Sequence, residues 1–380
     1  MIINEPGNYT LLYTAEDSCG NKTEETRELT VSRAAQVFGA IWDGSDSTRW
    51  TRTDLSESFS DPEPAVNNGT GSSPFDNIMP WSGMEIVQDE TAGTLVSIPK
   101  YWYKWTREGT SMHLQIANEA KSGFLVSPAH ADRGDGVGER DVVYVGRYHS
   151  MYNFKSTTGY WPSSSKKRDV FRNGMHSLGS DIWQYDFAMY WTIAMLYLVE
   201  FADWNSQAVI GYGCGNNSTE GQTGYTDAMQ YHTGTDAASR TTYGHVQYRH
   251  IEGLWDSLYD WVDGIYFNGN DIYVINNPAQ FSDTENGVLI GTRASNNGIA
   301  KTFTEPSTSG YEYALYPTTS QIGGHTIRTC DECEYNNVGN TLAVGGSYRQ
   351  SQASGMFYMN GYWPSSIDSG YIGSRLQKLP

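Results

Sequence analysis

The chain is poor in cysteine, with four in 380 residues. Cys19, Cys214, Cys330 and Cys333 are too few for a disulfide scaffold at this length, so packing must supply the stability. Cys330 and Cys333 have the spacing of a redox motif or of half a zinc site, but the sequence offers no second close pair. A local disulfide or two free thiols is therefore the favoured interpretation, and we expect neither a metal nor a cofactor.

Basic residues and long apolar runs are scarce as well. Lys and Arg number 25 against 43 Asp and Glu, which gives a net charge of −18. Such a charge repels phosphate backbones and anionic lipid headgroups, so nucleic acid and membrane surfaces are disfavoured as partners. No apolar run approaches the ~20 residues that span a bilayer, and the N-terminus lacks a basic region followed by an apolar stretch. These absences predict a soluble chain.

Patterns typical of catalysis are few. No Walker loop or Rossmann fingerprint lies next to a suitable strand–helix unit. The two closely spaced histidines, His245 and His250, are interpreted as surface or core residues. Acidic residues surround two tryptophans, and paired carboxylates beside aromatic rings are the chemistry of glycoside hydrolysis. These residues are Glu252, Asp256, Asp260 and Asp263. A structural turn is the favoured interpretation, so we expect no enzyme and keep a glycan-cleaving enzyme as the alternative.

One acidic loop is a weak candidate for calcium. The segment 132–141 brings Asp132, Asp135, Glu139 and Asp141 close together, but without the spacing of an EF-hand. A solvated loop is the favoured interpretation.

Aromatic residues and glycine, in contrast, are abundant. Phe, Trp and Tyr make up 13% of the chain, and there are 40 glycines. Tyr and Trp supply stiff contact surface at low entropic cost, and Gly lets the loops that carry them bend, which is the composition of binding loops. A Gly-rich β-protein with an aromatic core is the alternative.

The N-terminal segment predicts a β-hairpin. Two alternating stretches within residues 5–31 flank a turn at Asp17–Asn21. A lone hairpin is marginal in water, so we expect these strands to complete a larger sheet. The pattern PGNYTLLYTAEDSCGN resembles the last two strands of bacterial and phage immunoglobulin-like repeats. The resemblance implies a partial immunoglobulin-like domain over residues 1–33.

Residues 34–74 predict a connector and linker. The stretch from Trp42 to Asp54, WDGSDSTRWTRTD, resembles a segment of bacteriophage tail and fibre proteins. Residues 55–74 are rich in Ser, Gly, Pro and Asn, which is linker chemistry. A domain boundary is expected there.

The remainder, 75–380, predicts strands over 94–106, 113–130 and 141–148 and one long core helix over 183–210. The hexapeptide GYWPSS occurs twice, at 159–164 and 361–366, and predicts two similar aromatic loops. Three features follow one another along the chain: the helix, the segment 253–264 with Trp255 and Trp261, and a closing GGSY…GSR. This order resembles the C-type lectin fold in its formylglycine-generating-enzyme-like branch. Tyr348 stands where that branch has Trp, and Arg375 matches its closing Arg. The resemblance implies an α+β fold of the C-type lectin kind, preceded by the immunoglobulin-like β-sandwich remnant.

The C-terminal segment 345–376 resembles the hypervariable segment of receptor-binding proteins diversified by retroelements, the family of the phage major tropism determinant. That family exchanges residues encoded by adenine-containing codons, and its segment runs from GG to GxR. The resemblance implies a ligand-binding set of Ser347, Tyr348, Arg349, Ser351, Tyr358, Asn360, Tyr362, Ser366, Asp368, Ser369 and Tyr371. A Ser- and Tyr-rich strand pair without diversification is the alternative. The EPN and QPD triplets of calcium-dependent sugar-binding lectins do not occur.

The resemblances together imply a receptor-binding protein of a phage virion, in its tail or fibre. The implied partners are a host cell-surface receptor, protein or glycan, and other virion proteins. A homo-oligomer is implied too, with the trimer of phage fibres as its form. A diversified adhesin on the bacterial cell surface is the closest alternative.

Overall fold

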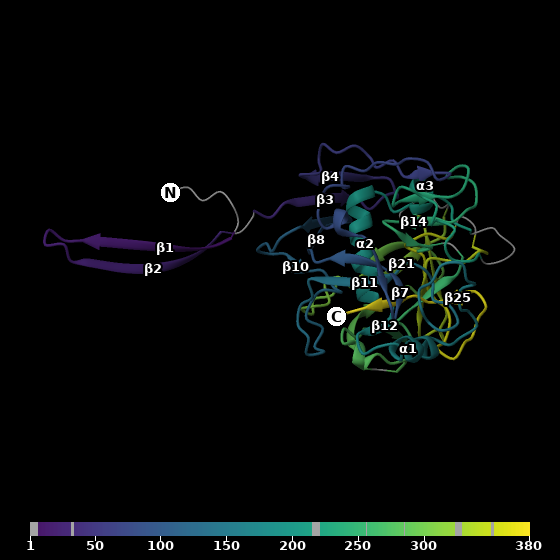
Figure 1. Ribbon diagram of the computed structural model, residues 1–380. Helices are drawn as coiled ribbons and strands as arrows, with labels where there is room; N and C mark the ends of the chain where they lie inside the picture. The colour runs from purple at the N-terminus through teal and green to yellow at the C-terminus, as the bar shows by residue number, and fades with distance from the viewer. Residues whose placement is uncertain are drawn as a thin grey trace.

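The computed structural model describes residues 7–31, 34–214, 221–255, 257–284, 286–323, 329–350 and 353–380. An N-terminal hairpin extends away from a larger main body (Figure 1). Strands β1 (Gly7–Glu16) and β2 (Lys22–Val31) pair antiparallel over their full length. The Asp17 carboxylate accepts hydrogen bonds from the backbone N–H groups of Cys19 (2.8 Å) and Asn21 (3.0 Å), which shapes the turn. The predicted hairpin is present, and among the described residues no other strand joins its sheet.

The main body is built from several sheets. One has the order β10-β8-β9-β3-β4, and a second has the order β12-β26-β11-β7-β6. Their strands are β3 (Val37–Trp42), β4 (Trp50–Asp54), β6 (Ile86–Asp89), β7 (Gly93–Pro99), β8 (Trp102–Glu108), β9 (Ser111–Ala117), β10 (Leu125–Val126), β11 (Val142–Gly146), β12 (Ile182–Gln184) and β26 (Leu376–Lys378).

The third large sheet positions the C-terminal segment. Its order is β21-β20-β22-β24-β23-β16-β25, and two smaller sheets have the orders β15-β14-β13-β5 and β17-β18-β19. Their strands are β5 (Ala65–Val66), β13 (Gly234–Thr235), β14 (Val246–Tyr248), β15 (Ile251–Glu252), β16 (Tyr259–Val262), β17 (Ile265–Asn268), β18 (Asp271–Val274), β19 (Val288–Thr292), β20 (Gly298–Phe303), β21 (Pro317–Gln321), β22 (Glu332–Tyr335), β23 (Leu342–Val344), β24 (Met359–Gly361) and β25 (Ile372–Gly373). The helices are η1 (Trp81–Gly83), α1 (Arg168–His176), α2 (Phe187–Phe201), α3 (Ser206–Val209) and η2 (Pro278–Gln280).

Helix α2 is the centre of the core, and it is shorter than the helix predicted over 183–210. It begins after Asp186, whose carboxylate accepts a hydrogen bond from the Met189 N–H at 2.8 Å, and it ends where Ala202 adopts a left-handed conformation. All 15 of its residues are buried, and it packs against β3 and β9. Within the described part of the chain, no helix combines the length and apolar character that crossing a membrane requires.

The predicted connector and linker over 34–74 is wrong, because this segment is built into the main body. Strand β3 lies between β4 and β9, and β5 pairs with β13. Trp42, Trp50 and Trp204 pack together, with ring centroids 5.4–6.3 Å apart. The aromatic side chains of this segment therefore belong to the core, and its Ser- and Gly-rich stretch is a surface loop rather than a domain boundary.

The predicted α+β class is also wrong. Strand makes up 34% and helix 10%, spread over several sheets, so the protein is mostly β. Neither the C-type lectin fold nor the immunoglobulin-like sandwich is confirmed. The expectation gave too much weight to one apolar helix, whereas the short strands that dominate the structure leave only weak alternation in the sequence.

Candidate functional site

The C-terminal segment is anchored to the core by a buried ion pair. The Arg375 Nε donates to Asp260 Oδ2 at 2.7 Å, and the two side chains are 0% and 2% exposed. The Arg375 guanidinium also donates to the backbone carbonyls of Glu252 (3.1 Å) and Gly253 (2.9 Å). Ile372, on β25, is buried and packs in the cluster that contains Trp261. The end of the segment is therefore rigidly held.

Three of the predicted binding residues lie inside the protein, so their expected exposure is wrong. Tyr358 and Asn360 both donate to the carboxylate of Glu334, the latter at 2.7 Å, and burial raises the pKa of the Tyr358 hydroxyl well above its usual value. Ser347 is buried and donates to the Gln350 side chain at 2.5 Å. Tyr358 and Asn360 are two residues apart and face the same side, and Met359 between them is buried as well, so alternation brings none of the three to the surface.

The other predicted residues that the structure describes reach the surface. Tyr362, Ser366 and Asp368 are exposed, Ser369 is half-buried, and Ser351 lies outside the described residues. Arg349 is exposed beside two half-buried tyrosines, with its guanidinium carbon 4.6 Å from the Tyr371 ring centroid and 5.7 Å from that of Tyr348. The two rings lie 5.6 Å apart. We call Tyr348, Arg349 and Tyr371 the Tyr–Arg cluster.

A second aromatic loop borders this surface, and no binding role was predicted for it. The Ser165 N–H donates to the Ser369 carbonyl at 3.0 Å, which ties the first GYWPSS copy to the C-terminal segment. Trp161 in that loop is 54% exposed, and its neighbour Tyr160 is also exposed. The repeated hexapeptide was the signal that could have identified this loop as part of one surface.

The three described acidic residues considered for glycoside hydrolysis form hydrogen bonds and ion pairs with the protein's own groups. Glu252 accepts hydrogen bonds from the Gly224 N–H at 2.7 Å and from the Thr226 hydroxyl at 2.6 Å. Asp263 is fully buried and paired with Arg172 at 2.6 Å. Asp260 holds Arg375, as described above, and Asp256 lies outside the described residues. A pair of carboxylates free to flank a sugar is therefore not formed by the three that are described.

The histidine and cysteine candidates are also core groups. Burial first, and then the neighbouring His232 and two arginines, lower the pKa of His250 to about 3, so it stays neutral. His245 stacks on Tyr225 with ring centroids 4.2 Å apart. Cys330 and Cys333 are buried thiols; the Cys330 Sγ donates to the Asp331 carboxylate at 3.3 Å, and burial raises the pKa of Cys333 to about 12.

Basic side chains of the protein pair with the acidic loop that was considered for calcium. Arg140 pairs with Asp135, and Lys100 lies 2.6 Å from Asp141 and 3.7 Å from Glu139. No group of three potential metal ligands forms anywhere in the described ranges. The loop is therefore neutralised by the protein's own side chains.

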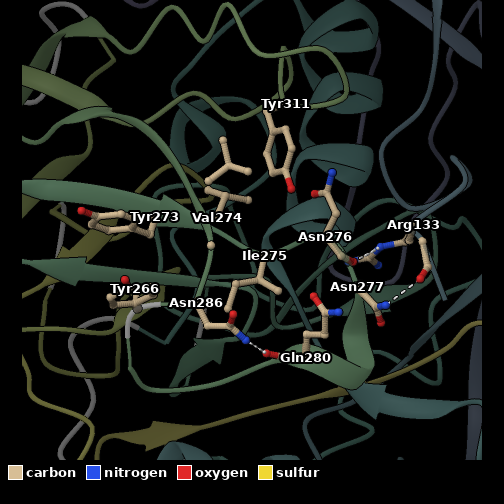
Figure 2. A pocket seen from close by; sticks show the side chains of 13 residues that line it. Arg133, Tyr266, Tyr273, Val274, Ile275, Asn276, Asn277, Gln280, Asn286 and Tyr311 are labelled. Atoms are coloured by element: carbon tan, nitrogen blue, oxygen red, sulfur yellow. Dashed lines mark hydrogen bonds between the residues drawn. The ribbon is translucent and has the colours of Figure 1, made fainter.

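A cavity of about 470 Å³ opens beside the small sheet β17-β18-β19 (Figure 2). Its wall contains tyrosine rings, side-chain amides and one guanidinium. The lining residues are Arg133, Gly134, Tyr266, Tyr273, Val274, Ile275, Asn276, Asn277, Gln280, Asn286, Gly287, Val288 and Tyr311. No sequence motif marks this cavity, because its residues come from three separate stretches of chain.

A second cavity, of about 570 Å³, is lined by a carboxyl group whose pKa is raised. Asp203 lines it together with Trp50 and Arg52. Burial raises the pKa of Asp203 from 3.8 to about 7 against the opposing hydrogen bond from the Asn205 N–H, and the charges of Asp46 and Asp61 raise it further.

This pKa predicts a pH dependence of stability. Between pH 3.8 and about 7 the folded chain keeps a proton on Asp203 that the unfolded chain has lost, so this group lowers stability as pH rises through that window. Asp203→Asn, which stays neutral, should remove this contribution and be more stable than the parent above the window. Urea unfolding of both chains across the window checks it, and parallel pH profiles would contradict it.

Comparison of the chain with protein-family models and with curated proteins finds no match. Function therefore has to be inferred from the residues and their geometry.

Proposed function

We propose that the chain is a receptor-binding protein of a phage tail or fibre, which recognises a host cell-surface ligand through the exposed part of its C-terminal segment. The observation that carries the proposal is the Tyr–Arg cluster, an exposed guanidinium beside two tyrosine rings. Tyr and Arg are the residue types that dominate binding energy at recognition surfaces. Exposed Trp161 and Tyr362 extend the same chemistry beyond the cluster.

The way in which the segment is anchored supports this proposal. Arg375 and Ile372 hold it from the core side, while Arg349 and Asp368 face solvent. Side chains on the outer surface can therefore be exchanged without disturbing the packing beneath them. This separation is what a diversified binding segment requires, and a diversified bacterial adhesin would need the same design.

The hairpin supports attachment to other virion proteins or to further copies of the chain, a trimer included. A two-stranded sheet is marginal in water by itself. Leu12 and Tyr13 on β1 and Leu29 on β2 are exposed, and no third strand from the described residues covers them. A partner that adds strands here would bury these side chains.

Loss of the Tyr–Arg cluster should weaken binding and spare the fold. Arg349→Ala removes an exposed contact group and Tyr348→Ala a half-buried one, whereas Tyr371 also packs against the core cluster of Trp261 and is left in place. Truncated hot-spot residues cost about 2 kcal/mol or more, which is roughly a thirtyfold loss of affinity. Adsorption of the purified variants to host cells measures this, and thermal melting in parallel shows whether the fold is intact.

Arg49→Ala is the matched control, because the Arg49 side chain is 64% exposed and lies between β3 and β4, in a different sheet from β25. It should adsorb like the parent. Equal adsorption of the parent and both cluster variants would contradict the proposal.

Diversification of the C-terminal segment would leave a signature in the DNA that encodes it. We expect the encoding genome to carry a near-identical, non-coding copy of the region for residues 345–376, with a reverse transcriptase gene nearby. Sequencing the flanking DNA tests this. Absence of both would remove diversification from the proposal and leave receptor binding to be tested by adsorption.

A further inference from the structure

We infer that the cavity beside β17-β18-β19 is a binding site for an uncharged saccharide, separate from the Tyr–Arg cluster. The inference does not depend on the proposed function. At about 470 Å³ the cavity lies within the usual size range of small-molecule sites.

The side-chain amides suit sugar hydroxyls. A hydroxyl both donates and accepts hydrogen bonds, and a carboxamide offers both partners side by side. Asn276 and Asn277 are held in place, since Asn276 accepts from the Tyr313 hydroxyl at 2.7 Å and Asn277 donates to the Gly134 carbonyl at 2.7 Å. Gln280 and Asn286 are exposed at the cavity (Figure 2). The wall therefore combines fixed and adjustable amides.

Tyrosine rings supply the apolar part of the site. Figure 2 shows Tyr311 and Tyr273 approaching the cavity from different parts of the chain, and both are half-buried. Tyr273 is held by stacking on Tyr266, with ring centroids 5.0 Å apart and planes 13° from parallel. A flat ring fixed in this way can cover the C–H face of a sugar, while its hydroxyl stays available to polar groups.

Arg133 holds the cavity wall in place from beneath. Its side chain is 2% exposed, its Nε donates to the Asn276 carbonyl at 2.6 Å, and its Nη1 lies 2.8 Å from Asp186 Oδ2. Its Nη2 makes no hydrogen bond within the described residues. Because the guanidinium is buried beneath the cavity surface, it fixes the backbone of Asn276 and does not itself contact a ligand.

The charge balance favours an uncharged ligand. Asp186 is fully buried and already compensates the Arg133 charge, and no other charged side chain lines the cavity among the described residues. An anionic sugar would meet no free positive charge there and would approach a chain of net charge −18.

The test uses chitotriose and maltotriose as uncharged ligands and trigalacturonate as the anionic one, titrated at millimolar concentrations into the full chain and followed by NMR. We expect at least one uncharged trisaccharide to bind. Gln280→Ala combined with Asn286→Ala should weaken it about tenfold, because two hydrogen-bonding groups are lost. Asn286→Trp should abolish binding by filling the cavity.

Asn296→Trp is the matched control, because Asn296 is exposed in the loop between β19 and β20 and does not line the cavity. It should bind like the parent, as should Arg349→Ala, which separates this site from the proposed receptor surface. No binding of either uncharged trisaccharide, binding of trigalacturonate alone, or full binding by a correctly folded Asn286→Trp variant would each overturn the inference.

Discussion

Arg375→Met is expected to destabilise the chain by about 3–5 kcal/mol, because it leaves the Asp260 carboxylate buried without its cation. Asp260 is 2% exposed, and the Arg375 Nε lies 2.7 Å from its Oδ2. The substitution also strips the carbonyls of Glu252 and Gly253 of a donor. Urea denaturation of the parent and the variant measures the difference in the free energy of unfolding.

The double variant Arg375→Met, Asp260→Leu is the informative control. It removes both charges, and replacing a whole buried pair by apolar residues costs far less than breaking it. We expect it to recover a large part of the lost stability. A single variant as stable as the parent would show that the ion pair does not anchor the segment.

Trp255→Ala should cost about 3–5 kcal/mol as well, since it empties a large volume in the core. Trp255 is fully buried, and its indole Nε1 donates to the Gly211 carbonyl at 3.0 Å. The variant loses the ring and leaves that carbonyl without its donor. Thermal and urea unfolding measure the effect.

Trp161→Ala is the matched control for the same change of residue type. Trp161 is more than half exposed, so its loss should change stability by only about 0.5 kcal/mol. Equal destabilisation by the two substitutions would mean that the loop carrying Trp161 is a packing element rather than a surface for recognition.

The sequence was informative where a local pattern determines the structure. The Asp17 turn and the alternation around it fixed the hairpin, and the apolar run gave α2, although the cap at Asp186 and the left-handed Ala202 shortened it. The 34–74 segment was misjudged because its polar loop residues hide Trp42 and Trp50, whose burial depends on distant partners such as Trp204.

The candidate site was predictable only in part, for a similar reason. Tyr348, Arg349 and Tyr371 come from the segment that the resemblance indicated, and they gather on the surface. Tyr358 and Asn360 have the same residue types but face Glu334, and composition does not reveal which side of a central strand is covered. The cavity at Arg133 and Tyr311 depends on long-range contacts that leave no motif.

Hydrogen–deuterium exchange of the full chain, with and without host envelope fragments, tests the central claim most directly, because it locates the contact surface without any mutation. The proposed receptor binding predicts that envelope fragments slow exchange in the peptides that contain Tyr348–Arg349 and Asp368–Tyr371, and in the adjoining loop at 159–166. Protection confined to other parts of the main body, with these peptides unchanged, would contradict it.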